Sequence, residues 1–191
     1  MTRFDRSPHS PSQWTPSKFA AFTLIELMIA LAIAAILLAA AAPNTRAFLA
    51  AAELRERSEA LMRSLTVARS EAIKRGTRVD VCPSVDREHC ASSATWEAGW
   101  VTFVNESRSD QPAEAAAILS RETRGRAGIA ISGNRPVADY ISFTSIGHAR
   151  RHDGALQMGT FTVCRRGQGA QKVVLANSGR VRLDLTDEIC P

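Results

Sequence analysis

Arginine is concentrated in one stretch of this sequence. The 191 residues include 24 Lys or Arg and 19 Asp or Glu, which gives a net charge of +5. Residues 121–182 hold eleven basic and three acidic residues, whereas residues 76–120 hold three basic and seven acidic ones. Base composition accounts for part of the arginine content, because the chain has 21 Arg and only 3 Lys. It does not explain why one stretch is mainly positive and the preceding stretch mainly negative. Since the planar guanidinium group binds phosphate oxygens at two points, residues 121–182 are the part best suited to contact a polyanion.

A smaller group of cations near the C-terminus lies at or between predicted turns. Alternation places Arg180 and Arg182 side by side on one face of a strand, directly after a turn that ends at Gly179. The candidate phosphate-binding residues are Gly179, Arg180, Arg182, Arg165, Arg166 and Lys172. A solvated strand face after a turn would give the same pattern, so both interpretations stay open.

Residue patterns for catalysis or metal binding are weak. His148 and His152 are four residues apart, but Gly147 and Gly154 flank them, so a helix that presents both imidazoles to one metal is not expected. We find no nucleophile elbow, Walker loop or acidic metal cluster. The sequence therefore predicts no metal site, no cofactor and no enzymatic activity.

The four cysteines favour two disulfides over a metal site, because no zinc-ligand spacing is present. Disulfides require an oxidising compartment, which agrees with export of this part of the chain. Sequence alone allows three pairings, and four buried free thiols are the alternative. We favour Cys82 with Cys90 and Cys164 with Cys190, because each pair closes a loop within its own region.

An apolar segment follows a basic, proline-containing stretch at the N-terminus. From Leu27 to Thr45, nineteen consecutive residues carry no charge, which is long enough for a helix to cross a bilayer. Glu26 directly precedes these residues, five residues into the apolar segment that begins at Phe22, where an ionised carboxylate costs several kcal/mol unless it is paired. Glu26 is therefore a candidate functional residue. Secretory cleavage after the alanines at 40–42 is the alternative interpretation.

The rest of the chain predicts a helix followed by strands. Residues 46–75 place an apolar stripe on one helical face, formed by Leu54, Leu61, Leu65, Ala68 and Ala72. The arginines of this helix, Arg55, Arg57, Arg63 and Arg69, are interpreted as a solvated face. After Gly76 the period changes to two, with strands expected around 79–82, 100–104, 141–146, 159–164, 172–176 and 180–185. The expected fold class is α+β, with a long N-terminal helix, membrane-spanning in its first half, packed on an antiparallel β-sheet domain.

The residues Phe-Thr-Leu-Ile-Glu-Leu-Met at positions 22–28, behind a basic leader, resemble the N-terminus of the type IV pilin and pseudopilin superfamily. The resemblance implies that a prepilin peptidase cuts between Ala21 and Phe22 and methylates the new Phe22 amine. It also implies that Glu26 serves assembly, by pairing with the Phe22 amine of a neighbouring subunit. The family usually has glycine where this chain has Ala21, and a small side chain is preserved there.

Two further motifs narrow the resemblance to the GspH/FimT branch of that superfamily. They are Leu-Thr-Val-Ala-Arg-Ser-Glu-Ala-Ile-Lys-Arg-Gly at 65–76 and Trp-Glu-Ala-Gly-Trp-Val-Thr-Phe at 96–103. In addition, Gly-Arg-Val-Arg at 179–182 is similar to the Gly-Arg-x-Arg motif of FimT-type minor pilins, which are implicated in DNA capture during natural transformation. We interpret Trp96, Trp100 and Phe103 as core aromatics.

These observations together imply a minor pilin of a type IV pilus that binds DNA without sequence preference. The expected segments are a removed leader at 1–21, a transmembrane and pilus-core helix at 22–43, an amphipathic helix at 44–75 and a β-rich head at 76–191. Expected partners are other major and minor pilins, prepilin peptidase and DNA. The expected location is the bacterial inner membrane, with the head in the periplasm, and the pilus after assembly. A GspH-like pseudopilin with a purely structural role in type II secretion is the alternative, and a membrane-anchored enzyme is a third hypothesis.

Overall fold

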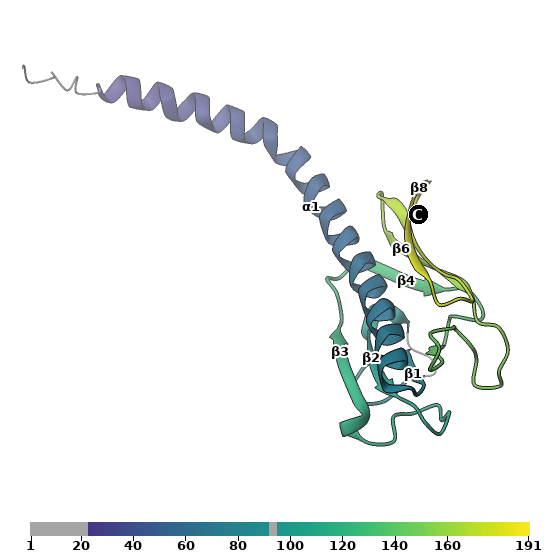
Figure 1. Ribbon diagram of the computed structural model, residues 1–191. Helices are drawn as coiled ribbons and strands as arrows, with labels where there is room; N and C mark the ends of the chain where they lie inside the picture. Colours follow the sequence, from purple (N-terminus) through teal and green to yellow (C-terminus); the bar gives the residue numbers. More distant parts are fainter. Residues whose placement is uncertain (1–22, 92–94) are drawn as a thin grey trace, which may run out of the picture. The chain divides into compact units, whose positions relative to one another are not determined.

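The computed structural model describes residues 23–91 and 95–191, and its chain divides into two compact units, Met1–Pro43 and Asn44–Pro191. The leader at 1–21, with Ala21 and Phe22 at the predicted cleavage site, lies outside the described residues. Helix α1 (Leu24–Arg75) runs through both units (Figure 1).

The start of α1 is fixed by a local cap. The Thr23 hydroxyl accepts a hydrogen bond from the Glu26 amide at 3.3 Å, which satisfies one of the free N–H groups of the first turn. Within the described ranges 23–91 and 95–191, no helix combines the length and apolar character needed to cross a membrane. The membrane-spanning role of 22–43 therefore stays a prediction.

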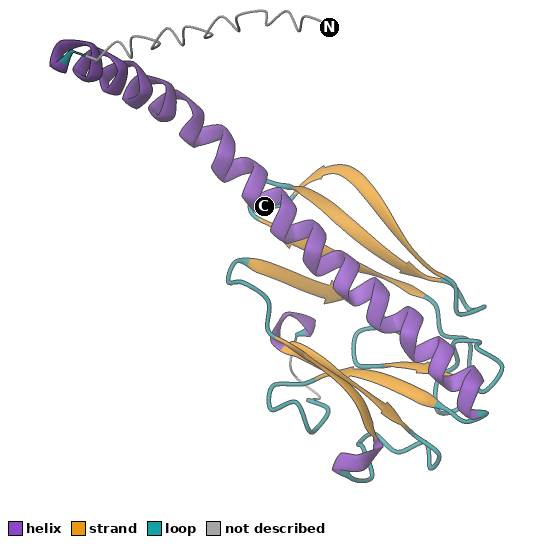
Figure 2. Ribbon diagram, turned by 60° about the vertical axis from the view of Figure 1, so that its left-hand side comes forward, coloured by secondary structure: helices purple, strands orange, loops and turns teal. Residues whose placement is uncertain are grey.

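The predicted apolar stripe of α1 is confirmed as the helix's contribution to the core. Leu54, Leu61, Leu65, Ala68 and Ala72 are each at most 2% exposed. They pack against side chains from both sheets, and Figure 2 shows the second half of α1 lying across the strands. Gly76, with a φ of 66°, follows the helix as a left-handed stop.

The strands form two antiparallel sheets. Sheet A has the order β3 (Ile118–Thr123), β2 (Gly99–Val104), β1 (Val79–Pro83) and β5 (Ile141–Phe143). Sheet B has the order β4 (Ile129–Gly133), β6 (Gly159–Arg165), β7 (Gly169–Leu175) and β8 (Val181–Ile189). Short 3₁₀ helices occur at η1 (Trp96–Ala98) and η2 (Ala115–Ala117).

One large core joins α1 to both sheets. Its central side chains from the sheets include Val79, Val81, Trp100, Phe161 and Val173. Since side chains alternate along a strand, the opposite face of β1 contributes Cys82 to a smaller cluster with Val101 and Phe103. All of these buried side chains belong to the unit Asn44–Pro191, which therefore contains a complete core and folds as a domain.

The predicted α+β fold of a long helix packed on antiparallel sheets is confirmed, but the strand boundaries differ in detail, and β8 continues to Ile189 instead of ending at residue 185. The sequence-based expectation omitted β3 and β4, extended β5 to residue 146 and started β7 at Lys172 rather than Gly169. The residues after Phe143 form a turn instead, because the amide of Gly147 donates to the carbonyl of Thr144 at 2.7 Å.

Candidate nucleic-acid interface

Gly179 holds the turn before Arg180 in a fixed position. The turn joins β7 to β8 and is closed by the Gly179 amide, which donates to the Ala176 carbonyl at 2.9 Å. Gly179 has a φ of 78°, and a Cβ atom built on it would overlap the carbonyl oxygen of Gly147. Only glycine fits both the left-handed backbone and this close approach. The turn therefore packs directly on the neighbouring turn at residues 144–147.

Arg180 and Arg182 leave this turn as exposed side chains. Val181 and Leu183 lie on the other face of β8 and are half-buried, as the alternation predicts, but Leu185, the third residue predicted for that face, is 70% exposed. Arg180 has no hydrogen-bond or ion-pair partner for its side chain among the described residues. Arg182, with 53% of its side chain exposed, donates from Nε to both oxygens of Asp184 at 3.0 and 3.1 Å.

Lys172 lies on the same sheet face as Arg182. In the β7–β8 register Lys172 is opposite Asp184, and Arg182 is opposite Val174, so Lys172 and Arg182 are diagonal neighbours. The Lys172 ammonium forms an ion pair with Glu188 at 3.0 Å. The structure thus brings Lys172, Arg180 and Arg182 into one group, which we call the hairpin group.

Arg165 and Arg166 lie at the other end of sheet B. The turn after Leu175 neighbours Gly159, because Leu175 pairs with both Gly159 and Val181, whereas Arg165 is the last residue of β6. Six residues of strand separate the two ends, or about 20 Å at about 3.3 Å per residue. Arg165 forms an ion pair with Glu53 of α1, while Arg166 is exposed and has no side-chain partner among the described residues. The six predicted residues therefore form two groups rather than one.

Arg69 of α1 is a neighbour of the hairpin group that sequence reasoning missed. Its Nε atom is buried without a hydrogen-bond partner in the described part of the chain. The same atom lies 3.1 Å from the position that a Cβ would take at Gly179 and also at Gly147. Helical periodicity put Arg69 on the solvated face, and no sequence signal could have placed it against two turns about 80 and 110 residues further along the chain.

The solvated-face interpretation is wrong for Arg57. This side chain is only 8% exposed, and its guanidinium lies over the indole of Trp100 at 4.2 Å. Burial lowers the pKa of Arg57, and the nearby carboxylates of Glu122 and Glu56 oppose that change. The indole of Trp100 covers the helix here, so the arginine is part of the packed interior.

His152 takes part in a buried polar network instead of a metal site. Asp80, 1% exposed, accepts hydrogen bonds from Ser142, from Asn105 at 2.6 Å and from His152 at 2.6 Å. His152 also stacks on Tyr140, with a centroid distance of 4.2 Å. Within the part of the chain that the structure describes, no group of His, Cys, Asp or Glu is arranged to hold a metal ion.

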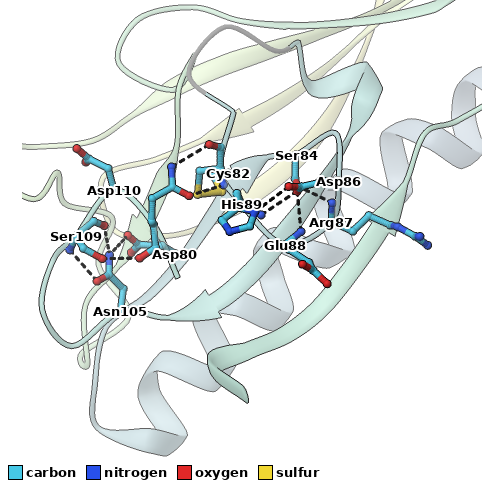
Figure 3. The surroundings of a disulfide bond; sticks show 12 residues. Asp80, Cys82, Ser84, Asp86, Arg87, Glu88, His89, Asn105, Ser109 and Asp110 are labelled. Carbon is cyan, nitrogen blue, oxygen red and sulfur yellow. Dashed lines mark hydrogen bonds and ion pairs between the residues drawn. A yellow bond between two sulfur atoms is a disulfide. The ribbon is translucent and has the colours of Figure 1, made fainter. Parts of the chain in front are cut away.

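Both predicted disulfides are confirmed, Cys82 with Cys90 and Cys164 with Cys190. Figure 3 shows the first of them between the Asp80–Asn105 network and the loop that contains Asp86. Asp86 accepts hydrogen bonds from the amides of Glu88 and His89, each at 2.9 Å. The second disulfide ties the end of β8 to the end of β6, beside Arg165.

Two family profiles match this sequence. The profile described as Type II transport protein GspH matches residues 57–179, which is more than half of the chain. The chain belongs to the GspH family. The profile described as Prokaryotic N-terminal methylation motif matches residues 16–42, which include Ala21, Phe22 and Glu26.

Solved structures with a similar fold are minor pilins and pseudopilins. The type IV minor pilin FimU of Pseudomonas aeruginosa, in space group P21, has a TM-score of 0.56 and 22% identity, covering 75% of this chain and 99% of that chain. The structure of FimU in space group P65 has a TM-score of 0.52 and 20% identity, covering 72% of this chain and 99% of that chain. The minor pseudopilin EpsH from the type 2 secretion system of Vibrio cholerae has a TM-score of 0.49 and 16% identity, covering 71% of this chain and 99% of that chain. No curated protein matches this sequence.

This chain is therefore a GspH-family protein with a prokaryotic N-terminal methylation motif, and its fold is similar to that of the minor pilin FimU. Its family implies interaction with other pilins, and its methylation motif implies processing by a prepilin peptidase and anchoring in the inner membrane before assembly. Members of the family are structural subunits and are not known as enzymes.

Proposed function

We propose that this GspH-family protein is a FimT-like minor pilin that captures extracellular DNA for natural transformation. The observation that carries the proposal is the hairpin group: Arg180 is exposed and has no acidic partner among residues 23–91 and 95–191, on a turn that Gly179 fixes against Gly147. A fixed turn reduces the entropy lost when the side chain meets a phosphate.

The ion pairs limit how strongly each cation contributes. To bind a phosphate, Arg182 must break or share its ion pair with Asp184, and Lys172 must break or share its ion pair with Glu188. Arg165 is restricted in the same way by its ion pair with Glu53. Arg180 and Arg166 carry no such restriction. The binding is therefore weak, with phosphate contacts only and no base readout, which suits a pilus that accepts any DNA sequence.

A salt-dependent DNA shift assay on residues 44–191 tests this function. If Lys172, Arg180 and Arg182 each neutralise one phosphate, the log-log salt slope on duplex DNA is about -2.7, and it is steeper if Arg165 and Arg166 also take part. Arg180→Gln with Arg182→Gln should weaken binding and make the slope shallower by about 1.8.

The matched control removes two arginines from the exposed helix face. Arg55 and Arg63 both pair with Glu59 and are 65% and 60% exposed, so Arg55→Gln with Arg63→Gln removes the same charge without touching the hairpin group. Equal losses from the two double variants would indicate diffuse attraction to a basic domain and refute the proposed site.

A purely structural pseudopilin in type II secretion is the second candidate function. It is favoured by the carboxylate partners of Arg165, Lys172 and Arg182, since paired cations need no external anion. Absence of DNA binding at low salt, with a folded domain, would select this candidate.

The proposed maturation of the chain is cleavage between Ala21 and Phe22, followed by methylation of the Phe22 amine. Glu26 then pairs with the amine of a neighbouring subunit during assembly, which offsets the cost of placing its carboxylate among apolar helices. Intact mass of the protein from its native membrane should correspond to a methylated chain that starts at Phe22. A start after Ala42 would indicate secretory cleavage and contradict this proposal.

A further inference from the structure

Arg57 has one guanidinium nitrogen that no group in the described structure satisfies. Its Nη1 atom lies 3.5 Å from a carboxylate oxygen of Glu122, and its planar face is covered by Trp100. Its Nη2 atom is buried and has no hydrogen-bond acceptor among the described residues. A buried charged donor without an acceptor is unfavourable, so this nitrogen indicates a position where an acceptor binds.

The guanidinium of Arg57 lines a pocket of about 340 Å³ between α1 and the segment that follows β3. Ala60 and Ile129 form apolar parts of the wall, and Arg124 and Arg126 come from the segment after β3. The backbone at Gly125 approaches closely, because a Cβ atom there would lie 3.0 Å from Arg57 Nε. Arg124 is exposed and its side chain has no partner in the described part of the chain, so a second free donor lines the same pocket.

The charges around the pocket favour an anion with a single charge. The lining residues include three cations, Arg57, Arg124 and Arg126, and three anions, Glu53, Glu56 and Glu122, and Arg165 adds a fourth cation beside the pocket through its ion pair with Glu53. Glu53 is held by Arg126 at 3.0 Å and by Arg165, and Glu122 is held by Arg57. The balance is one positive charge, which a carboxylate neutralises, whereas a doubly charged phosphate meets repulsion from Glu56, which has no ion-pair partner in the described residues.

We propose that this pocket binds the carboxylate of an Asp or Glu side chain from a neighbouring subunit. A carboxylate has the planar geometry to accept from Arg57 Nη2 and from the Arg124 guanidinium together. The occupant is a protein side chain because members of this family interact with other pilins. The site is separate from the hairpin group, so it does not depend on DNA binding.

Side-chain NMR of the arginine Nε–H groups in residues 44–191 tests this site. The probes are sodium acetate, a capped glutamate (N-acetyl-glutamate amide) and inorganic phosphate, each added at constant ionic strength against chloride. Saturable shifts of the Arg57 signal with acetate and with the capped glutamate, at higher affinity than with phosphate, are expected. No saturable shift, or an equal response to chloride, would overturn the proposal, and a response to acetate alone would assign the pocket to small free acids instead of a protein side chain.

Arg124→Gln tests the second donor without disturbing the core, because Arg124 is exposed. Loss of one charge-assisted hydrogen bond should weaken binding of the capped glutamate by about tenfold or more. Arg121→Gln is the matched control, since Arg121, which lies in β3 shortly before Arg124, is also exposed but does not line the pocket. Equal affinities for Arg124→Gln and Arg121→Gln would refute the role of Arg124.

Discussion

Replacement of Gly179 by alanine should destabilise the head domain through two separable effects. The first is the left-handed backbone: Gly179 has a φ of 78°, and an L-residue there costs about 1 to 2 kcal/mol. The second is steric, because the added methyl group would overlap the Gly147 carbonyl, which is backbone and cannot rotate away. Forcing an extra methyl into a packed contact costs about 1 to 3 kcal/mol. The sum is about 2 to 5 kcal/mol.

Gly167→Ala separates the two effects. Gly167 has a φ of 75°, nearly that of Gly179, and lies in the other turn of β7, but a Cβ there would meet nothing within 4 Å. Only the backbone effect of about 1 to 2 kcal/mol is expected for this variant. The difference between the two variants therefore measures the contact between the Gly179 turn and the Gly147 turn.

Urea unfolding of residues 44–191, followed by tryptophan fluorescence, provides the assay. Trp96 and Trp100 are each 1% exposed, so their emission reports exposure of the core. The free energy of unfolding should fall further for Gly179→Ala than for Gly167→Ala, by about 1 to 3 kcal/mol, with similar m values. Equal losses would refute the reasoning, because they would mean that the turn before Arg180 moves freely away from Gly147.

Two further predictions concern the disulfides and a histidine. The two disulfides close loops with sequence separations of 26 and 8 residues. Loop-closure entropy predicts that double alanine substitution lowers the free energy of unfolding by about 3.5 kcal/mol for Cys164–Cys190 and by about 2.5 kcal/mol for Cys82–Cys90. The reverse order in urea unfolding would contradict this account. The hydrogen bond to Asp86 raises the pKa of His89, so this contact stabilises the fold below the ordinary histidine pKa and is lost as pH rises through the elevated value. Asp86→Asn should lower the pKa of His89 in an NMR titration and Glu88→Gln should lower it much less; an unchanged value in Asp86→Asn would exclude the contact.

Local periodicity explains which elements could be predicted from sequence. The stripe from Leu54 to Ala72 repeats at helical spacing, and β8 alternates from Val181 to Leu185, so the stripe and this first part of β8 could be predicted, whereas the remainder of β8 up to Ile189 lacks the alternation. Strand β3 reads Ile-Leu-Ser-Arg-Glu-Thr, without an apolar alternation, because it is an edge strand of sheet A with a largely solvated surface. Strand β4 has buried Ile129 and Ile131, but its five residues lie between turns and give too short a signal.

The charged sites depended on contacts between distant parts of the chain. Nothing in the sequence near Arg57 indicates that Trp100 covers it, or that Glu53 pairs with Arg165, 112 residues away. The candidate cations stay a prediction as phosphate ligands, and periodicity could not divide them between two ends of a sheet. The distance between the two groups of cations follows from the strand register of sheet B, which tertiary packing sets.

The packing of α1 across both sheets determines how this domain resists mechanical load. Tension that enters the domain through the helix acts along the helix axis, parallel to the buried stripe from Leu54 to Ala72, which extends about 27 Å at about 1.5 Å per residue. All five stripe side chains must then slide past the sheets together, in shear, instead of separating one at a time as in peeling. The same interface that stabilises the fold at rest is therefore oriented to bear force along the helix.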